Sequence, residues 1–525
     1  MASVWARNKV RLSAPSVQRL TRSDPNPSIH FEHSRSGAVV PVAIVHGRDH
    51  PMHSLVSPER EAQRTFDHTN GGRSPGFLVS IGLGAGYHLG KFVADDALKQ
   101  LLIIEPDPSV CLAILTNLDL SDLLGDARVS LIVNPDGDEI DDAIAPIYHP
   151  LLHGDLGVVA LRSFSAANPE AFERAEIAIT GTIERLRLDS ATQAEFGSQW
   201  TRNALFNLPE TRMTASIPNQ FESAIVVAAG PSLEQELRSL SAARINGPAI
   251  VATDTAFPAL ATSGIEPDIV VSIDTQIHTY HHFLPTVDSG ALFVFELAVH
   301  PSVTRMVHKR MFVAGSHPLS RYVSTRLAAM RQVDTSGGNV TCAAIEVARL
   351  FGAKKVGVVG ADFGYSNGKP YARGTYLYRY FESKSERIRP LSSHAAELVF
   401  RDSRNRRTVS KDGVTYTPPL MDHYREMTQT LLNRPGVRSI ETERRGQNWS
   451  SFLAHYVSDL EKLPIVAVSP IDYVRRLDTR QRSLVSTLFP LATRGLAQSS
   501  DAQIAISMAR DRTIALGKSI LQRFD

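Results

Sequence analysis

The chain has 525 residues and a formal net charge of +2 at pH 7, and this length predicts roughly two to four domains. The near balance of charge gives no general reason to expect a nucleic acid or a membrane surface as a partner. The two cysteines lie far apart, no stretch resembles a signal peptide, and no apolar run approaches the length of a membrane span, so we expect a cytoplasmic protein.

Residues 1–75 are rich in Pro, His and Arg, and we expect them to form a small unit that is mostly β. From Gly76 the pattern changes to a strand, a glycine-rich turn, a helix and a second strand that ends at Glu105. This alternation of strands and helices is typical of a parallel sheet. Residues 76–165 are therefore predicted to form a Rossmann-like unit.

The glycine-rich turn carries Gly82, Gly84 and Gly86, and Glu105 ends the next strand. In a dinucleotide or S-adenosylmethionine site, such glycines let the backbone approach the ligand and an acidic residue binds the ribose. Glycines also allow close packing of a helix on a strand, and a glycine turn alone is a weak signal. We therefore expect this unit to bind neither NAD nor S-adenosylmethionine.

Residues 166–215 have the apolar spacing of helices and predict a helical connector. A second series of strands and helices follows, so residues 216–445 are predicted to form a central domain around another parallel sheet. Residues 446–525 have amphipathic helical spacing, which indicates a helical C-terminal domain for packing or partner binding. The expected fold class is α/β, with two Rossmann-like parallel-sheet units and a helical C-terminal region.

The stretch IVVAAGPSLEQEL places Gly230, Pro231 and Ser232 between a buried strand and a helix. Ser232 and Gln235 fit a capping box at the helix start, and Gly230 leaves room above the strand for a ligand. The start of a helix offers N–H groups and a positive dipole to an anion. The same residues also fit an ordinary capped turn, so the other strands have to distinguish the two interpretations.

Acidic and hydroxyl residues follow the other strands of the central domain. Asp254, Asp274 and Asp362 each follow a predicted strand, and open parallel sheets bind ligands at the carboxyl ends of their strands. The segment DTSGG precedes a helix, where hydroxyl groups and a flexible backbone suit a phosphate. Its candidate residues are Thr335, Ser336 and Gly337. Together these segments predict a ligand site at one edge of the sheet.

The chain resembles the motility accessory factor (Maf) family, bacterial transferases that glycosylate flagellin with nonulosonic acids such as pseudaminic or legionaminic acid. The glycine turn with IIEPDP resembles the family's amino-terminal Rossmann-like unit, and FGSQWTRNALFNLP resembles its connector. The core from Gly230 to Tyr365 resembles its central domain. The resemblance implies a nonulosonic acid donor activated by CMP, and Ser or Thr of flagellin as the acceptor.

The central domain is similar in turn to bacterial sialyltransferases that use CMP-sugars. The matching segments are the Gly-Pro-Ser-Leu turn, TSGGNVTCAA, GADF and a later Tyr-Ala pair. By this resemblance the turn from Gly230 to Ser232 lies by the cytidine nucleotide, and Thr335 and Ser336 bind its phosphate. Gly337 and Asp362 lie in the same matching segments and are expected to contribute to nucleotide binding.

Asp254 and Asp274 depart from this pattern, because the sialyltransferases tend to carry Asn there. Two carboxylates near a phosphate require a cation or a hydroxyl partner. Either each of them accepts a hydrogen bond from the ribose or the base, so that Asp254 binds the nucleotide directly, or Asp254 and Asp274 together hold Mg²⁺ or Mn²⁺. The core also resembles archaeal hydroxymethylpterin pyrophosphokinases, which use ATP and magnesium. A diphosphokinase is therefore an alternative, and a flagellin-binding chaperone without turnover is another.

The segment VTYTPPLMDHYREM supplies the expected catalytic groups. The sialyltransferases place a His, with a Tyr nearby, before a late helix, which implies His423 as general base and Tyr416 as its neighbour. A His titrates near neutral pH and can take the proton of a Ser or Thr hydroxyl. Asp274 completes the expected catalytic set. The segment RIRPLSSHAAELVFRDSRNRRTVSKDGVTYT is expected to form a hairpin or mobile flap. It carries Arg401, Arg404, Arg406 and Arg407, which are expected to be either solvated or in contact with an acidic sugar or an acidic flagellin surface.

Overall fold

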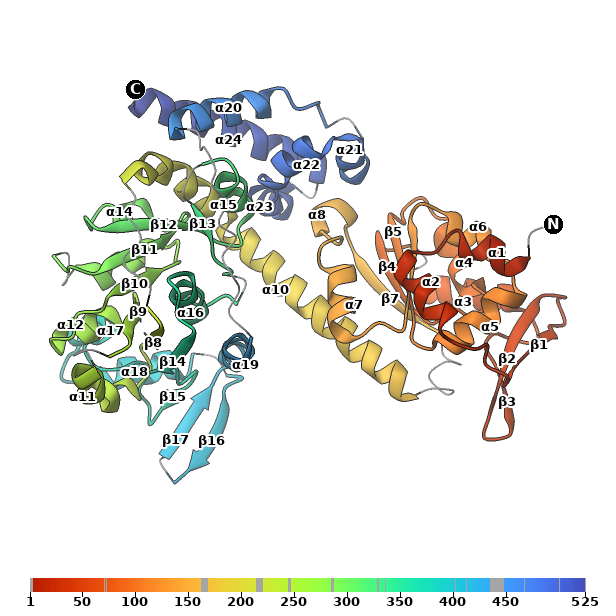
Figure 1. Cartoon of the computed structure of the whole chain (residues 1–525), viewed down its shortest axis with the longest axis horizontal. Helices are drawn as coiled ribbons and strands as arrows, with labels where there is room; N and C mark the ends of the chain where they lie inside the picture. The colour runs from red at the N-terminus through yellow and green to blue at the C-terminus, as the bar shows by residue number, and fades with distance from the viewer. Residues whose placement is uncertain are drawn as a thin grey trace. The chain divides into compact units, whose positions relative to one another are not determined.

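The computed structural model describes residues 3–69, 71, 73–161, 169–213, 221–243, 247–284, 288–327, 330–335, 337–401, 403–411, 413–434, 448–466, 468–499 and 501–524. Contacts divide the chain into two compact units, whose elements are labelled in Figure 1. Unit 1 comprises Met1–Ala194, Val466–Leu477 and Gly495–Ala505. Unit 2 comprises Glu195–Ile465, Asp478–Arg494 and Ile506–Asp525.

A four-stranded parallel sheet in the order β6-β5-β4-β7 forms the centre of unit 1. Its strands are β4 (Phe77–Ile81), β5 (Gln100–Glu105), β6 (Val129–Val133) and β7 (Leu156–Ala160). The helices that follow them are α4 (Tyr87–Val93), α5 (Pro108–Asn117), α6 (Ser121–Gly125), α7 (Gly137–Ile144) and α8 (Pro150–His153). Alternate side chains of β4 and β5 enter two different hydrophobic clusters, because both faces of the sheet are covered. The parallel sheet predicted for residues 76–165 is confirmed.

The first 75 residues contribute both helices and strands to unit 1. The helices are α1 (Val4–Lys9), α2 (Ala14–Thr21) and α3 (Pro58–His68). The strands β1 (Ile29–His33), β2 (Val39–Val45) and β3 (Arg48–Pro51) form an antiparallel sheet. Ser3 and Ser13 cap the first two helices with their side chains. Leu20, Ala43 and Met52 join the same hydrophobic cluster as β4 and β5, so this segment shares their core.

The predicted helical connector lies mainly in α10 (Pro169–Asn207), a single helix of 39 residues that continues into η1 (Leu208–Met213). The part of the helix up to Ala194 belongs to unit 1, and the part from Glu195 belongs to unit 2. In unit 2, the side-chain amide of Asn203 donates to the carbonyls of Thr275 and Ala298 at 3.0 Å each. The end of α10 is therefore fixed to the loops that follow two strands of unit 2.

Unit 2 contains a seven-stranded parallel sheet in the order β13-β12-β11-β10-β9-β8-β14. The strands are β8 (Ser223–Val227), β9 (Ala249–Thr253), β10 (Ile269–Ser272), β11 (Leu292–Glu296), β12 (Arg310–Ala314), β13 (Arg331–Gln332) and β14 (Lys355–Val359). The inner strands consist of buried, mostly apolar residues, as expected for a sheet covered on both faces. The second parallel sheet predicted from the sequence is therefore confirmed.

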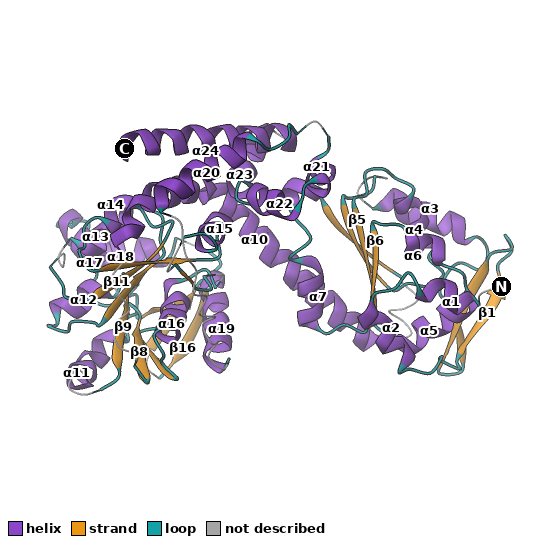
Figure 2. Cartoon of the chain, turned by 45° about the horizontal axis from the view of Figure 1, so that its top comes forward, coloured by secondary structure: helices purple, strands orange, loops and turns teal. Residues whose placement is uncertain are grey.

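Helices cover both faces of this sheet (Figures 1 and 2). α16 (Val340–Leu350) packs across β8, β9, β10 and β14, and α19 (Pro419–Asn433) packs on α16. The opposite face carries a cluster of phenylalanines, in which Phe257, Phe283 and Phe293 contact one another. The helices on that side include α11 (Leu233–Ala243), α12 (Phe257–Thr262) and α13 (Tyr280–Phe283).

A small antiparallel sheet and a set of helices complete unit 2. The sheet has the order β15-β17-β16, with β15 (Tyr365–Ser366), β16 (Arg406–Ser410) and β17 (Gly413–Thr417). Other elements are η2 (Ile277–Thr279), α14 (Pro301–Thr304), α15 (Pro318–Ser324), α17 (Tyr376–Lys384) and α18 (Leu391–Val399). The predicted hairpin is confirmed for β16 and β17, whereas the first half of the same segment contains the helix α18. The predicted helical C-terminal region holds α20 (Trp449–Glu461), α21 (Pro470–Arg476), α22 (Thr479–Ser486), α23 (Phe489–Ser499) and α24 (Ala502–Phe524), shared between the two units. In the described part of the chain, no helix combines the length and apolarity that crossing a membrane requires.

Candidate active site

The polar residues predicted from the sequence gather where the strands of unit 2 end. β8 and β14 are neighbours in the sheet although they are far apart in the chain. The chain continues from β8 to β9 on one side, whereas β14 lies on the other side of β8. Open parallel sheets bind ligands at the carboxyl ends of strands where the strand order reverses in this way. The loops after β8 and β14 therefore form the centre of the candidate site.

Asp362, in the loop after β14, holds the turn after β8. Its carboxylate accepts hydrogen bonds from the backbone N–H of Ser232 at 3.1 Å and from the Ser232 hydroxyl at 2.9 Å. The Gly230 N–H donates to the Gly360 carbonyl at 2.7 Å. A Cβ at Gly230 would overlap both the Asp362 carboxylate and the Gly360 carbonyl oxygen. Glycine at this position is therefore needed for the close approach of the two loops.

The backbone N–H groups of the Gly230–Ser232 turn donate within the protein. Pro231 has no N–H, and the three residues after Ser232 each donate to the carbonyl three positions earlier. The Ser232 hydroxyl, predicted to form a capping box with Gln235, donates to Asp362. A phosphate at this turn would therefore compete with the Asp362 carboxylate for the Ser232 N–H.

Asp254 and Asp274 follow β9 and β10, as predicted, but they differ in exposure. Asp254 is buried, and its carboxylate accepts from the Thr255 N–H at 2.7 Å and from the Ser272 hydroxyl at 2.6 Å. Burial raises the pKa of Asp254. Asp274 is exposed and accepts from the Gln276 N–H at 2.9 Å. Partial desolvation by its neighbours, with the charge of Asp254 in addition, raises the pKa of Asp274. Asp274 is the carboxylate of this pair that a ligand can reach.

Glu296, at the end of β11, is a further carboxylate at this edge that the sequence patterns do not single out. Its carboxylate accepts from the Ala298 N–H at 2.5 Å, the Gly315 N–H at 3.2 Å and the Ser320 hydroxyl at 2.6 Å. Burial raises the pKa of Glu296. The one signal in the sequence is a Glu that ends the apolar stretch FVF. Glu296 fixes the loop after β12 and the start of α15.

Thr335, predicted to bind a phosphate, is held by this same loop after β12. The Thr335 N–H donates to the Ser316 hydroxyl at 3.1 Å, and the Thr335 hydroxyl accepts from the Ser316 N–H at 2.8 Å. The Thr335 hydroxyl still has a proton that it can donate to a ligand. Gly337 lies closely against Cys342, because a Cβ at Gly337 would be 3.0 Å from the Cys342 Cβ. The predicted phosphate ligand Ser336 lies outside the described residues.

His423, the predicted general base, lies near the start of α19. The same stretch of α19 contacts two loops of the site. A Cβ at Gly338 would lie 3.3 Å from the Tyr424 ring, and Arg425 donates to the Phe363 carbonyl at 2.9 Å. His423 itself is partly exposed. The structure thus places this part of α19 beside the segment after β13 and the loop after β14.

Tyr416 lies on β17, opposite Tyr365 of β15 and Arg407 of β16. Its ring packs edge to face on the ring of Phe400, with 4.9 Å between the ring centroids. These described contacts are with neighbours other than His423. Cooperation of Tyr416 with His423 therefore stays a prediction.

A group of aromatic residues lies beside the carboxylates at this edge. Burial, with the neighbouring phenols of Tyr365 and Tyr376, raises the pKa of Tyr371 to about 12, and the charge of Asp254 acts in the same direction. The Tyr376 ring meets the His282 ring edge to face, with 4.6 Å between centroids. Burial lowers the pKa of His282 to about 4, so this imidazole is neutral at pH 7. Tyr371 belongs to the Tyr-Ala pair of the sialyltransferase resemblance, whereas the packing of Tyr376 on His282 is not predicted by the sequence patterns.

The glycine turn of unit 1 is filled by side chains of the same unit. The Leu83 N–H donates to the Glu105 carboxylate at 2.9 Å, and the Ala85 N–H donates to the His53 ring at 3.0 Å. A Cβ at Gly84 would lie 2.6 Å from Nε2 of His53. Burial raises the pKa of Glu105 to about 7. The carboxylate that would bind a ribose is therefore bonded to the turn itself.

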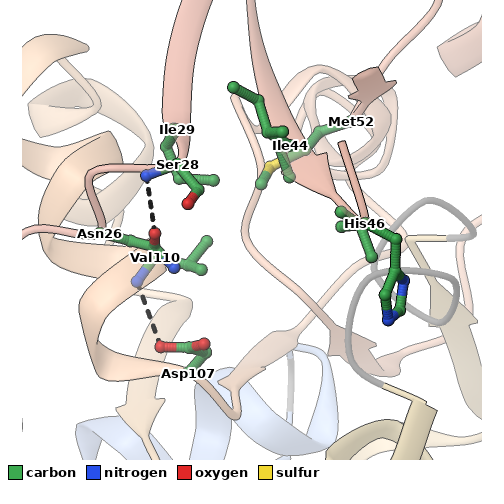
Figure 3. Close-up of a pocket in the computed structure, with 10 residues that line it drawn as sticks. Asn26, Ser28, Ile29, Ile44, His46, Met52, Asp107 and Val110 are labelled. Carbon is green, nitrogen blue, oxygen red and sulfur yellow. Dashed lines mark hydrogen bonds between the residues drawn. The ribbon is translucent and has the colours of Figure 1, made fainter. Parts of the chain in front are cut away.

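Unit 1 contains a cavity of 270 Å³ beside the start of α5 (Figure 3). The Asp107 carboxylate accepts from the Val110 N–H at 3.2 Å, and the Asn26 side chain accepts from the Ser28 N–H at 2.9 Å. These lining polar groups thus bond to the nearby backbone. None of the residues predicted to form the active site lines this cavity.

Unit 1 also brings three metal-ligating side chains together. Ligand atoms of His30, Glu32 and Asp49 lie within 4.8 Å of one another. Nε2 of His30 and a carboxylate oxygen of Glu32 form a hydrogen bond at 3.2 Å, and both side chains are more than one-third exposed. This hydrogen bond accounts for the proximity of His30 and Glu32 without a bound ion.

Comparisons with known proteins relate the chain to a glycosyltransferase fold. The family described as 6-hydroxymethylpterin diphosphokinase MptE-like matches residues 199–368. The solved structure of a Maf glycosyltransferase from Magnetospirillum magneticum AMB-1 is similar with a TM-score of 0.58 and 15% identity, over 99% of this chain and 96% of that chain. The chain therefore has the two-unit α/β fold of a Maf glycosyltransferase, and the expected resemblance is confirmed at the level of the fold.

Relatives in sequence occur in Treponema pallidum (strain Nichols), where each is described as an uncharacterized protein. One is 32% identical over 186 residues, which are 35% of this chain and 65% of the relative. A second is 33% identical over 169 residues, which are 31% of this chain and 80% of the relative. A third is 28% identical over 219 residues, which are 41% of this chain and 47% of the relative. The chain thus spans less than two thirds of the first and third relatives, and it belongs to the same family as the second.

Proposed function

We propose that the protein is a glycosyltransferase that moves a nonulosonic acid, of the pseudaminic or legionaminic type, from a CMP donor to Ser or Thr of flagellin. The observation that carries this proposal is the fold, which matches that of a Maf glycosyltransferase over 99% of the chain. The proposed nucleotide-binding residues that the structure describes lie in the carboxyl-edge loops of unit 2, and the proposed base lies on α19. In this role the protein acts in the cytoplasm and serves flagellum assembly and motility.

The proposed reaction is a direct displacement at the anomeric carbon. The bond from this carbon to the CMP phosphate oxygen breaks, and its electron pair leaves with CMP. Thr335 and Ser336 donate hydrogen bonds to the phosphate and so stabilise the charge that develops on it. The acceptor oxygen forms the new bond to the anomeric carbon, while His423 takes its proton. Tyr416 is the proposed neighbour of this base.

Asp274 and Asp254 are the residues that would hold a divalent cation, Mg²⁺ or Mn²⁺, at this edge. Carboxylate oxygens are the ligands that these cations prefer. The fit is uneven, because Asp274 is exposed whereas both oxygens of Asp254 already accept hydrogen bonds from Thr255 and Ser272. A cation here would neutralise charge on the phosphate.

A binding and transfer assay tests the proposed function. The purified protein is titrated with CMP, with CMP-activated nonulosonic acids and with ATP, and flagellin is then analysed by mass spectrometry after incubation with each sugar donor. We expect CMP binding and a mass increase on flagellin equal to one nonulosonic acid residue. Absence of both, with the protein folded, would refute the glycosyltransferase.

The phosphate assignment makes a prediction about a double variant. Thr335→Ala with Ser336→Ala should weaken CMP binding while the fold is kept, because each hydrogen bond to a charged group contributes roughly 1.5–3 kcal/mol. Isothermal titration measures the affinity. Thr262→Ala is the matched control, since the Thr262 hydroxyl donates to its own helix at 2.7 Å. Unchanged CMP affinity in the double variant would contradict the assignment.

A second candidate function is an ATP- and magnesium-dependent diphosphokinase at the same edge. The match of residues 199–368 to the family described as 6-hydroxymethylpterin diphosphokinase MptE-like favours it. Tight ATP binding without CMP binding in the titration above would select this candidate. Transfer of diphosphate to hydroxymethylpterin would then be the activity to measure.

A further inference from the structure

The hairpin of β16 and β17 extends from the rest of unit 2 (Figure 1). β16 is an edge strand in the order β15-β17-β16, and all five of its residues are exposed. An edge strand presents backbone N–H and C=O groups that can pair with another extended segment. In the described part of unit 2, this hairpin therefore offers a site for the addition of a strand.

The hairpin is also strongly basic. Residues 401–413 contain five basic and two acidic residues, so this segment carries a charge of +3, whereas the whole chain carries +2. The basic residues, all exposed, are Arg401, Arg404, Arg406, Arg407 and Lys411. Concentrated charge of one sign attracts a partner of the opposite sign and accelerates its association.

Exposed apolar side chains accompany these charges. Val409 on β16 is 61% exposed, and Phe400, just before the hairpin, is 56% exposed. Charges on an edge strand alone protect it from pairing with other chains. An exposed Val409 between Arg407 and Lys411 has the opposite effect, since burying it against a partner is favourable. The combination fits a binding edge better than a protected one.

The hairpin is joined directly to the candidate active site. Nη2 of Arg406, on β16, donates to both carboxylate oxygens of Asp422, at 2.7 and 2.8 Å, and Asp422 precedes His423 in α19. Tyr416 lies on β17, one strand away from the free edge. A segment paired with β16 would therefore be attached to the same small sheet as Tyr416, on a strand whose Arg406 is linked to the start of α19.

We propose that the β16 edge binds an acidic, extended segment of the protein acceptor, which adds to the sheet as a further strand. The acceptor role rests on the proposed function. Arg407 and Lys411 attract the acidic side chains, the β16 backbone pairs with the acceptor backbone, and Val409 is buried by the contact. This mode of recognition gives affinity through the main chain and specificity through side chains. It holds the acceptor next to the site while its Ser or Thr hydroxyl reaches the base.

Charge reversal tests the proposal. In Arg407→Glu with Lys411→Glu, we expect the KM for the protein acceptor to rise about tenfold or more at low ionic strength, with kcat and the KM for the donor little changed. Added salt should raise the KM of the unaltered protein, because it screens exposed charges. The control is Arg238→Glu with Lys354→Glu, which makes the same change in charge at exposed positions of unit 2 outside the hairpin.

Hydrogen exchange provides a second readout that needs no catalysis. Binding of flagellin, or of an acidic peptide from it, should slow amide exchange in residues 406–410, and the charge-reversed protein should lose this protection. An unchanged acceptor KM together with unprotected β16 amides would overturn the proposal.

Donor binding distinguishes a failure of this proposal from a failure of the proposed function. If CMP binding and donor hydrolysis persist while the hairpin results are negative, only the docking edge is wrong. If CMP does not bind at all, the proposed function itself is refuted.

Discussion

Asp254 and Asp274 have the same chemistry but different surroundings. Asp254 is buried between hydrogen-bond donors, whereas Asp274 is exposed beside it. Asp274→Asn should therefore lower transfer activity about tenfold or more, as the loss of a cation ligand does, while the protein stays folded. A transfer assay in EDTA, with Mg²⁺ or Mn²⁺ added back, measures the cation requirement. Asp288→Asn, at another exposed position of unit 2, is the control. Full activity in EDTA would show that no cation is required. Full activity of Asp274→Asn would show that this residue is not part of the site.

Glu105 should make the stability of unit 1 depend on pH. Its pKa is raised from 4.5 to about 7 by burial, so the folded unit binds a proton that the unfolded chain has already lost between these values. Stability from this group is present below pH 4.5 and is lost as the pH rises to 7, on the order of 3 kcal/mol in total. Glu105→Gln should flatten this dependence.

The fluorescence of Trp5 can report on the unfolding of unit 1, because Trp5 packs against the core of unit 1 whereas Trp200 and Trp449 belong to unit 2. In a protein with Trp200→Phe and Trp449→Phe, denaturant unfolding followed by fluorescence gives the stability of unit 1 at each pH. The difference in stability between this protein and the same protein with Glu105→Gln added isolates the carboxyl group from the histidines. A difference that grows in the opposite direction would contradict the raised pKa of Glu105.

At the scale of the elements, the close approach of the turn after β8 to the loop after β14 depends on one small residue, Gly230. Gly230→Ala should force the two loops apart, because its Cβ overlaps the Asp362 carboxylate and the Gly360 carbonyl oxygen. We expect a loss of about 1–3 kcal/mol of stability in unit 2, and weaker CMP binding. Thermal unfolding and titration measure the two effects. Gly357→Ala in β14 is the matched control, since its Cβ would meet only Ile225, at 4.0 Å.

The strands of both sheets other than β13 could be predicted from the sequence because each is a short, mostly apolar run. β13 consists of Arg331 and Gln332 and has no such signal. β9, β10 and β14 lie where such runs place them. The loops that follow them could be assigned to one edge, because parallel strands end on the same side. The helices α1 and α2 also have a signal in the sequence, the capping residues Ser3 and Ser13. Because these helices are short and have few apolar residues, the composition of residues 1–75 favours a mostly β prediction instead.

The contacts between distant segments could not be read from local patterns. Asp362 bonds to Ser232 from 130 residues away in the sequence, and His53 fills the turn at Gly84 from an earlier segment. Such contacts depend on strand order and on the direction of single side chains. The burial that keeps His282 neutral likewise depends on a distant segment, since its ring packs on Tyr376, 94 residues later in the sequence.

At the scale of the whole molecule, two parallel sheets offer two carboxyl edges, and the structure distinguishes them. We expect the full-length protein to bind neither NAD nor S-adenosylmethionine, because Glu105 and His53 already accept the N–H groups of the glycine turn in unit 1. Isothermal titration with both compounds, and with CMP as the positive control, checks this. Micromolar affinity for either compound would contradict the expectation and indicate an oxidoreductase or a methyltransferase.

Unit 1 includes two segments from near the end of the chain, Val466–Leu477 and Gly495–Ala505. There, α21 packs on α8, and Arg475 donates to the Lys99 carbonyl at 3.1 Å. A ribosome reaches Val466 only 272 residues after Ala194, which takes roughly 15–55 s at ordinary synthesis rates. The surface of α8 therefore stays uncovered on the nascent chain during this time. Loss of the last part of the chain, through a premature stop or proteolysis, would damage the N-terminal unit as well as the end that is lost.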